Sequence, residues 1–145
     1  MALMTGKKCL IMGVANKRSI AWGVAQALHR EGAELAFTYA GERLKENVEE
    51  LVATLPDHGR IPVYPCDVTE SEEIKALFEK IAADWGRLDV FVHSVAYAKQ
   101  EDLVGSFSQI SWDGYALAHR ISAYSLIETA RHARPLLGRP AAGPS

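Results

Sequence analysis

The turn between Gly13 and Ser19 contains residue types that could bind a phosphate group. Gly13 ends an apolar run and Ser19–Ile20 begins an amphipathic one. A helix N-terminus, with unpaired N–H groups and a partial positive charge, should therefore face this turn. Glycine lets the backbone approach a ligand closely, and the Ser19 hydroxyl can bond a phosphate or cap the helix. Gly23 would let the helix lie close to a sheet. Because the run is not G-x-G-x-x-G, a plain turn before a capped helix explains its spacing equally well.

Two later segments could complete a nucleotide site. Asp67 follows an extended run, and a carboxylate beside the free N–H of Val68 can pair with the amino group and a ring nitrogen of adenine. The alternative is that Asp67 or Thr69 only shapes the start of the next helix. Small side chains at 94–98 would let a nicotinamide ribose pass, although any crowded strand end also requires small residues.

The residues at 39–43 bear on the choice between NAD and NADP. Glu42 could accept a hydrogen bond from a ribose 2′-OH, and Arg43 could bind a 2′-phosphate. Both could equally lie in the solvated first turn of a helix. Since Ala40 and Gly41 carry no charge to hold a phosphate, the pattern favours NAD.

The histidines and cysteines do not indicate a metal site. Five histidines are scattered along the chain without metal-ligand spacing to a Cys, Asp or Glu. We interpret His93 as a core residue whose hydrogen bonds are satisfied. Cys9 and Cys66 each lie in an apolar run outside any C-x-x-C pair, so we expect two buried free thiols.

Short apolar runs alternate with amphipathic segments. The strands are expected at 8–13, 34–39, 61–66 and 88–94. Helices should follow each strand, the third capped by Ser71 and ended by Gly86, and the last running from about 111 to about 134. We expect packing roles for three tryptophans: Trp22, Trp85 and Trp112.

This alternation predicts an α/β fold in which a parallel sheet has helices on both faces. Right-handed crossovers favour the strand order 3-2-1-4, with the two-proline segment at 61–66 on an edge. The fold class is therefore a Rossmann-type doubly wound parallel sheet, of which the chain has the N-terminal part only.

Composition sets the broad class of the protein. The chain has 145 residues, 48% hydrophobic and 23% charged, with a net charge of −2, which is typical of one globular domain. No basic stripe points to nucleic acid, and no polybasic tail points to a membrane. No signal-peptide core follows Met1, so we expect a cytoplasmic protein. Residues 1–137 are expected to form an incomplete NAD-binding domain. The Gly/Pro/Ala-rich tail, 138–145, is expected to be disordered.

With these residues assembled, the chain resembles the NADH-dependent enoyl-acyl-carrier-protein reductases of bacterial fatty-acid synthesis, a branch of the short-chain dehydrogenase/reductase superfamily. The resemblance runs from about Thr5 to Leu137. It is carried by these segments: 13–23, 32–39, 66–68, 91–94 and 121–125. The long turn from Gly13 to Ser19 is specific to this branch and decides its interpretation in favour of phosphate binding.

The resemblance implies NADH-dependent reduction of a trans-2-enoyl thioester carried on acyl carrier protein, by a homotetramer. It implies that the pyrophosphate is held by Gly13, Ser19 and Ile20, the adenine by Asp67 and Val68, the ribose and nicotinamide by Ser94 and Val95, and the acyl substrate by Ala98. The family often has Gln at the position of Ala40, so one ribose contact should be missing. It usually has Asp at the position of Arg120, so the surroundings of that helix should differ.

The family's chemistry also uses a tyrosine followed seven residues later by a lysine, a pair that assists enolate protonation and holds the nicotinamide ribose. None of the five tyrosines has a lysine at that spacing, and the last lysine is Lys99. We therefore expect no catalytic residues in a C-terminally truncated, inactive chain. The alternatives are a non-catalytic nucleotide-binding or interaction fragment, or another short-chain dehydrogenase acting on a ketone or alcohol.

Overall fold

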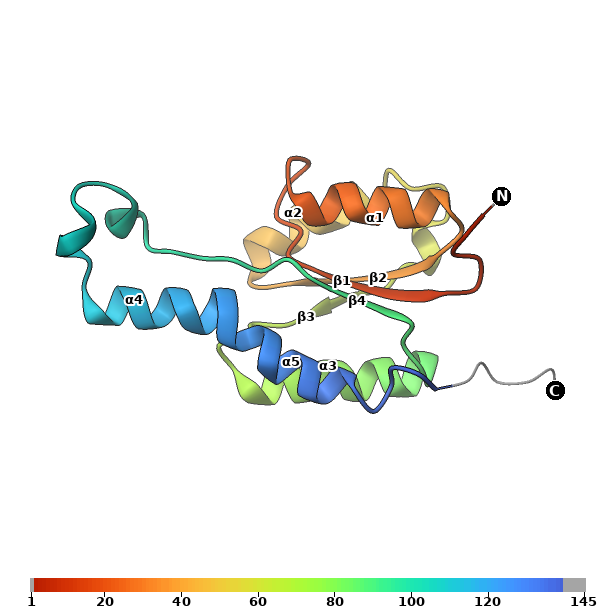
Figure 1. Ribbon diagram of the computed structural model, residues 1–145. Helices are drawn as coiled ribbons and strands as arrows, with labels where there is room; N and C mark the ends of the chain where they lie inside the picture. Colours follow the sequence, from red (N-terminus) through yellow and green to blue (C-terminus); the bar gives the residue numbers. More distant parts are fainter. Residues whose placement is uncertain (1, 140–145) are drawn as a thin grey trace.

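Residues 2–139 are described by a computed structural model, in which four parallel strands form one sheet (Figure 1). The strand order is β3-β2-β1-β4, which confirms the predicted fold class and order. The strands are β1 (Lys8–Met12), β2 (Glu34–Tyr39), β3 (Val63–Pro65) and β4 (Val90–His93). The two-proline segment is on an edge as predicted, because proline cannot donate to a neighbouring strand.

Helices cover both faces of the sheet. Helices α1 (Ile20–Arg30) and α2 (Glu42–Val52) lie on one face, and α3 (Ser71–Trp85) and α5 (Ser125–Ala133) lie on the other (Figure 1). Successive side chains of a strand point to opposite faces. Ile11 therefore packs in the α1/α2 core, while Leu10 and Met12 pack in the α3/α5 core.

The last helix is interrupted. We predicted one helix to about 134, whereas the structure has α4 (Trp112–His119), a π-helical turn η4 (Arg120–Tyr124) and then α5. Single π turns inside helices are frequent at functional sites. The 3₁₀ turns η1, η2 and η3 occupy His58–Arg60, Gln100–Leu103 and Phe107–Gln109.

Three local predictions were wrong. Ser71 is the first residue of α3 rather than its cap, which is Glu70, without a side-chain capping bond. Gly23 is exposed and a Cβ there would meet open space, because Ala21 and Ala25 make the close packing of α1 instead. Trp112 is 74% exposed and stacks only on Tyr115, whereas Trp22 is buried against Phe37 and Trp85 is half-buried. The prediction that Gly86 ends α3 is confirmed by its left-handed backbone, with φ +70°.

The last described residues lie beside the chain just before β4. Leu137 forms one parallel bridge with Leu88, and the Leu88 N–H donates to the Leu136 carbonyl at 3.1 Å. Gly138 lies in a turn and Arg139 donates to the Gly86 carbonyl at 3.2 Å. Most of the predicted disordered tail, 140–145, lies outside the described residues, so that prediction stays a prediction. Within residues 2–139, no helix combines the length and the apolar composition needed to cross a bilayer.

The ends of β1 and β4 approach each other more closely than any side chain would allow. Gly13 follows β1 with φ +108°, and a Cβ built there would overlap the carbonyl oxygen of Ser94, 2.5 Å from its carbonyl carbon. Both the backbone conformation and the space therefore require glycine.

We expect Gly13→Ala to lower the free energy of unfolding by about 3 kcal/mol, because it adds a strained φ to a collision between two backbones. Urea denaturation followed by circular dichroism measures the change. The matched control is Gly23→Ala, in open space within a helix, which should raise stability by about 0.5–1 kcal/mol. Equal effects of the two substitutions would contradict the assignment of Gly13.

Candidate cofactor-binding site

A cavity of about 480 Å³ opens at the carboxyl edge of the sheet. Its walls come from the carboxyl ends of all four strands and the residues just beyond them, including 13–15, 38–40, 66–69 and 94–97. Leu117 and Ile121 of the interrupted helix close the cavity. In doubly wound sheets ligands bind where neighbouring strands connect in opposite directions, and here that point is β1 between β2 and β4. The volume is within the range of about 300–1,000 Å³ that is typical of small-molecule sites.

The loop between β1 and α1 is held by its own polar groups. The Ser19 Oγ accepts hydrogen bonds from the N–H groups of Ala15 (2.9 Å) and Asn16 (3.1 Å). The Asn47 side chain of α2 donates to the Ala15 carbonyl at 3.2 Å. The Ser19 side chain makes no capping bond to α1. It fastens the loop instead, and its hydroxyl hydrogen stays available as a donor.

The start of α1 presents free donors. The Ser19 carbonyl accepts from the N–H groups of Trp22 and Gly23. Among residues 2–139 no acceptor is bonded to the Ile20 N–H, and the Ile20 side chain is 80% exposed. An N–H at a helix N-terminus with the helix dipole behind it is suited to an anion. Ser19 and Ile20 stand beside the cavity and do not line it.

The two carboxylate oxygens of Asp67 differ in their hydrogen bonds. Its Oδ1 accepts from the N–H (2.9 Å) and the hydroxyl (2.7 Å) of Thr69, which shapes the start of α3. Within residues 2–139, no donor is bonded to Asp67 Oδ2 and no acceptor is bonded to the Val68 N–H. Both residues line the cavity. The two alternatives left open by the sequence are therefore compatible, since one oxygen shapes the turn and the other remains free.

The segment after β4 forms the opposite wall. Ser94 donates its N–H to the Met12 carbonyl at 3.0 Å, and Ser94 and Val95 line the cavity. The Nε2 of His93 lies 2.8 Å from the Ser125 Oγ, in agreement with a histidine that is hydrogen-bonded within the protein. His93 is only half-buried, however, so its predicted place in the core is wrong. Burial lowers the pKa of His93 below its usual value.

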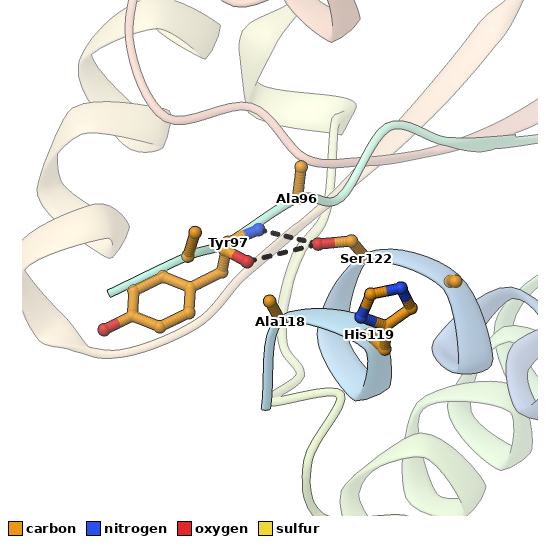
Figure 2. A pocket seen from close by; sticks show the side chains of 7 residues that line it. Ala96, Tyr97, Ala118, His119 and Ser122 are labelled. Carbon is orange, nitrogen blue, oxygen red and sulfur yellow. Dashed lines mark hydrogen bonds between the residues drawn. The ribbon is translucent and has the colours of Figure 1, made fainter. Parts of the chain in front are cut away.

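Ala98 lines a separate, neighbouring pocket of about 470 Å³ between the end of this segment and the interrupted helix (Figure 2). Five of the seven predicted cofactor residues thus meet in one cavity: Gly13, Asp67, Val68, Ser94 and Val95. Sequence reasoning missed Leu117, Ile121 and Ser122, because only the packing of the last helix brings them to these walls. Glu42 and Arg43 are exposed in the first turn of α2 and line neither cavity.

The two cysteines are free and buried, as predicted. Burial raises the pKa of Cys66 to about 12, with added effects of the negative Glu73, Asp67 and Glu128. Burial likewise raises the pKa of Cys9 to about 11, with Asp89 adding to it. Within residues 2–139, no three His, Cys, Asp or Glu side chains are grouped so that they could hold a metal.

Both thiols should react slowly with Ellman's reagent at pH 8 in the folded chain and rapidly in urea, because the thiolate is the reactive form. Since the folded pKa values exceed the unfolded value of about 9, their contribution to stability is complete below pH 9 and falls as the pH rises toward 11–12. Absorbance of the released thiol measures the rate. Rapid reaction of either thiol without denaturant would contradict its burial.

Together, the doubly wound sheet and the cavity at its switch point define a nucleotide-binding domain of the Rossmann class. The sequence pattern of the enoyl-(acyl carrier protein) reductase family matches residues 13–143, which is most of the chain. The chain therefore belongs to this family.

Individual proteins of this family are similar to the chain over most of its length. The NADH-dependent enoyl-[acyl-carrier-protein] reductase FabI of Bacillus cereus is 50% identical over 137 residues, 94% of this chain and 53% of that protein. The FabI of Bacillus subtilis is 47% identical over 92% of this chain and 52% of its own length. The crystal structure of the Bacillus cereus enzyme with NADP⁺ and indole naphthyridinone matches with a TM-score of 0.90, over 94% of this chain and 53% of that one. The chain spans about half the length of the curated relatives it matches.

Proposed function

We propose that this chain binds NAD(H) in the 480 Å³ cavity, as the cofactor-binding part of an enzyme for the NADH-dependent reduction of trans-2-enoyl groups carried on acyl carrier protein, in fatty-acid synthesis. The observation that carries the proposal is the set of unused polar groups around the cleft. A donor at Ile20 N–H and an acceptor–donor pair at Asp67 Oδ2 and Val68 N–H flank a backbone that only glycine can form.

Each residue receives a role from its position. Gly13 leaves room for the pyrophosphate, while the Ser19 hydroxyl and the Ile20 N–H donate to it. Asp67 Oδ2 accepts from the adenine amino group, and the Val68 N–H donates to a ring nitrogen. Ser94 and Val95 lie along the ribose and nicotinamide. Ala98, in the neighbouring pocket, faces the acyl substrate.

The cofactor, when bound, supplies a hydride for the β-carbon of the enoyl thioester. The residues of this chain bind and orient it. Because no tyrosine in the 145 residues has a lysine seven positions later, we assign no catalytic residue here and propose that these residues bind the cofactor without turnover. Residues 1–137 act as the NAD-binding unit. A homotetrameric state and a cytoplasmic location remain part of this proposal.

Isothermal titration of the chain with NADH should give a dissociation constant below 1 mM, roughly −4 kcal/mol or better. The same sample with NADH and a crotonyl thioester should show no decrease in NADH absorbance, because the residues that assist enolate protonation are absent. A folded chain that takes up no NADH at millimolar concentration would disprove the binding proposal. Measurable turnover would disprove the assignment of no catalytic residue.

Asp67→Asn separates the role of Asp67 in the turn from its role toward adenine. Asparagine keeps an oxygen for the Thr69 bonds but replaces the free acceptor by an amide donor. We expect the dissociation constant for NADH to rise about tenfold, or about 1.4 kcal/mol, with little change in melting temperature.

The control for Asp67→Asn is Glu70→Gln. It removes an equal charge at an exposed neighbouring position that does not line the cavity. Equal weakening by the two variants would mean that general electrostatics, rather than a bond to adenine, is responsible.

A further inference from the structure

One side chain of the π-helical turn holds a peptide of the opposite wall. The Ser122 Oγ accepts a hydrogen bond from the Tyr97 N–H at 3.0 Å and donates one to the Tyr97 carbonyl at 3.2 Å (Figure 2). Ser122 therefore bonds both the backbone N–H and the backbone carbonyl of Tyr97. Such a pair of bonds fixes the residue against rotation about its backbone dihedrals.

The peptide that Ser122 holds belongs to a segment that borders both cavities. The segment 94–97 lines the cofactor cavity, and its last two residues, Ala96 and Tyr97, also line the neighbouring pocket. This segment lies outside β4 and has no regular secondary structure. Its first end is fixed by the Ser94 N–H bond to Met12 and by the close approach to Gly13. Ser122 fixes the other end.

Two neighbours of Ser122 reach the same edge of the sheet. Arg120 donates to the Thr69 carbonyl at 2.6 Å, behind the turn that Asp67 shapes. The Ser125 Oγ lies 2.8 Å from His93 at the end of β4. The irregular turn thus contacts the loop after β3 and the segment beyond β4, and the first residue of α5 contacts the last residue of β4. Of these contacts, only that of Ser122 restrains the stretch 95–97.

We propose that Ser122 is a positioning residue, which fixes the Tyr97 peptide and so shapes the wall that receives the nicotinamide half of the cofactor. This inference rests on the proposed function. The adenine half is assigned to Asp67 and Val68, on the loop after β3. Loss of the Ser122 hydroxyl should therefore weaken the binding of NADH and leave the binding of ADP, which lacks nicotinamide and its ribose, unchanged.

The test compares Ser122→Ala, Ser122→Thr and, as a matched control, Ser108→Ala in the ¹⁵N-labelled chain, titrated with NADH and with ADP and followed by NMR. Ser108 is exposed and its hydroxyl bonds only Ser106. We expect Ser122→Ala to raise the dissociation constant of NADH about tenfold and that of ADP less than twofold. Threonine, which keeps the hydroxyl, should restore NADH binding to within about threefold, and Ser108→Ala should change nothing.

Amide hydrogen exchange gives a readout of the contact itself. The Tyr97 N–H should exchange faster in Ser122→Ala and at the original rate in Ser122→Thr. Equal losses for NADH and ADP, or no loss for either, would overturn the inference while leaving the proposed function standing. If the unaltered chain binds neither ligand, the proposed function fails, and the inference with it. If Ser122→Ala does not fold, Ser122→Cys, a weaker donor and acceptor, must bind NADH less tightly than the threonine variant, or the inference is wrong.

Discussion

The site depends on one close approach, where the backbone after β1 meets the backbone after β4. Gly13 and Ser94 are separated by less than a side chain would need. The contact sets how the two strand ends leave the sheet, at the point where β2 and β4 flank β1 on opposite sides. Because the chain then turns to opposite faces, a cleft opens above this contact. A side chain at Gly13 would collide with the Ser94 backbone and force the two strand ends apart.

Around this contact, the polar groups divide into those that hold the loops and those left for a ligand. Ser19 Oγ accepts from the N–H groups of Ala15 and Asn16, so the loop is held by bonds within the protein. Asp67 Oδ1 accepts both bonds from Thr69, whereas no donor within residues 2–139 is bonded to Oδ2. A loop held by its own bonds loses less entropy when a ligand binds. The same division explains why a structural and a ligand-binding interpretation of one residue can both hold.

The outer edge of the sheet, at β4, differs from the cleft. Within residues 2–139 no strand pairs with the outer edge of β4, and the one bridge on that side joins Leu137 to Leu88, just before the strand. The loop between β4 and α4 projects from the molecule beside the interrupted helix (Figure 1). Large apolar side chains are exposed on this loop and helix: Leu103, Val104, Phe107, Trp112, Leu126 and Ile127. An unpaired strand edge and an apolar surface of this kind favour association. The relatives that this chain matches are about twice as long.

The sequence by itself determined the α/β class, the strand order, the edge position of β3, the buried thiols and five residues of the cleft: Gly13, Asp67, Val68, Ser94 and Val95. These follow from local periodicity, from proline and glycine chemistry, and from the rule that parallel strands end at one edge. Only the tertiary structure decided that Gly13 is required by Ser94, that Gly23 is not required by the sheet, and that a π turn directs Ser122 to Tyr97. The contacts of Gly13 with Ser94 and of Ser122 with Tyr97 join residues that are distant in sequence, and the second also depends on an irregular turn in a helix. The surroundings of Gly23 depend on how α1 lies on the sheet. A periodic pattern records which face of an element is buried, and it does not record which atoms of another element that face will meet.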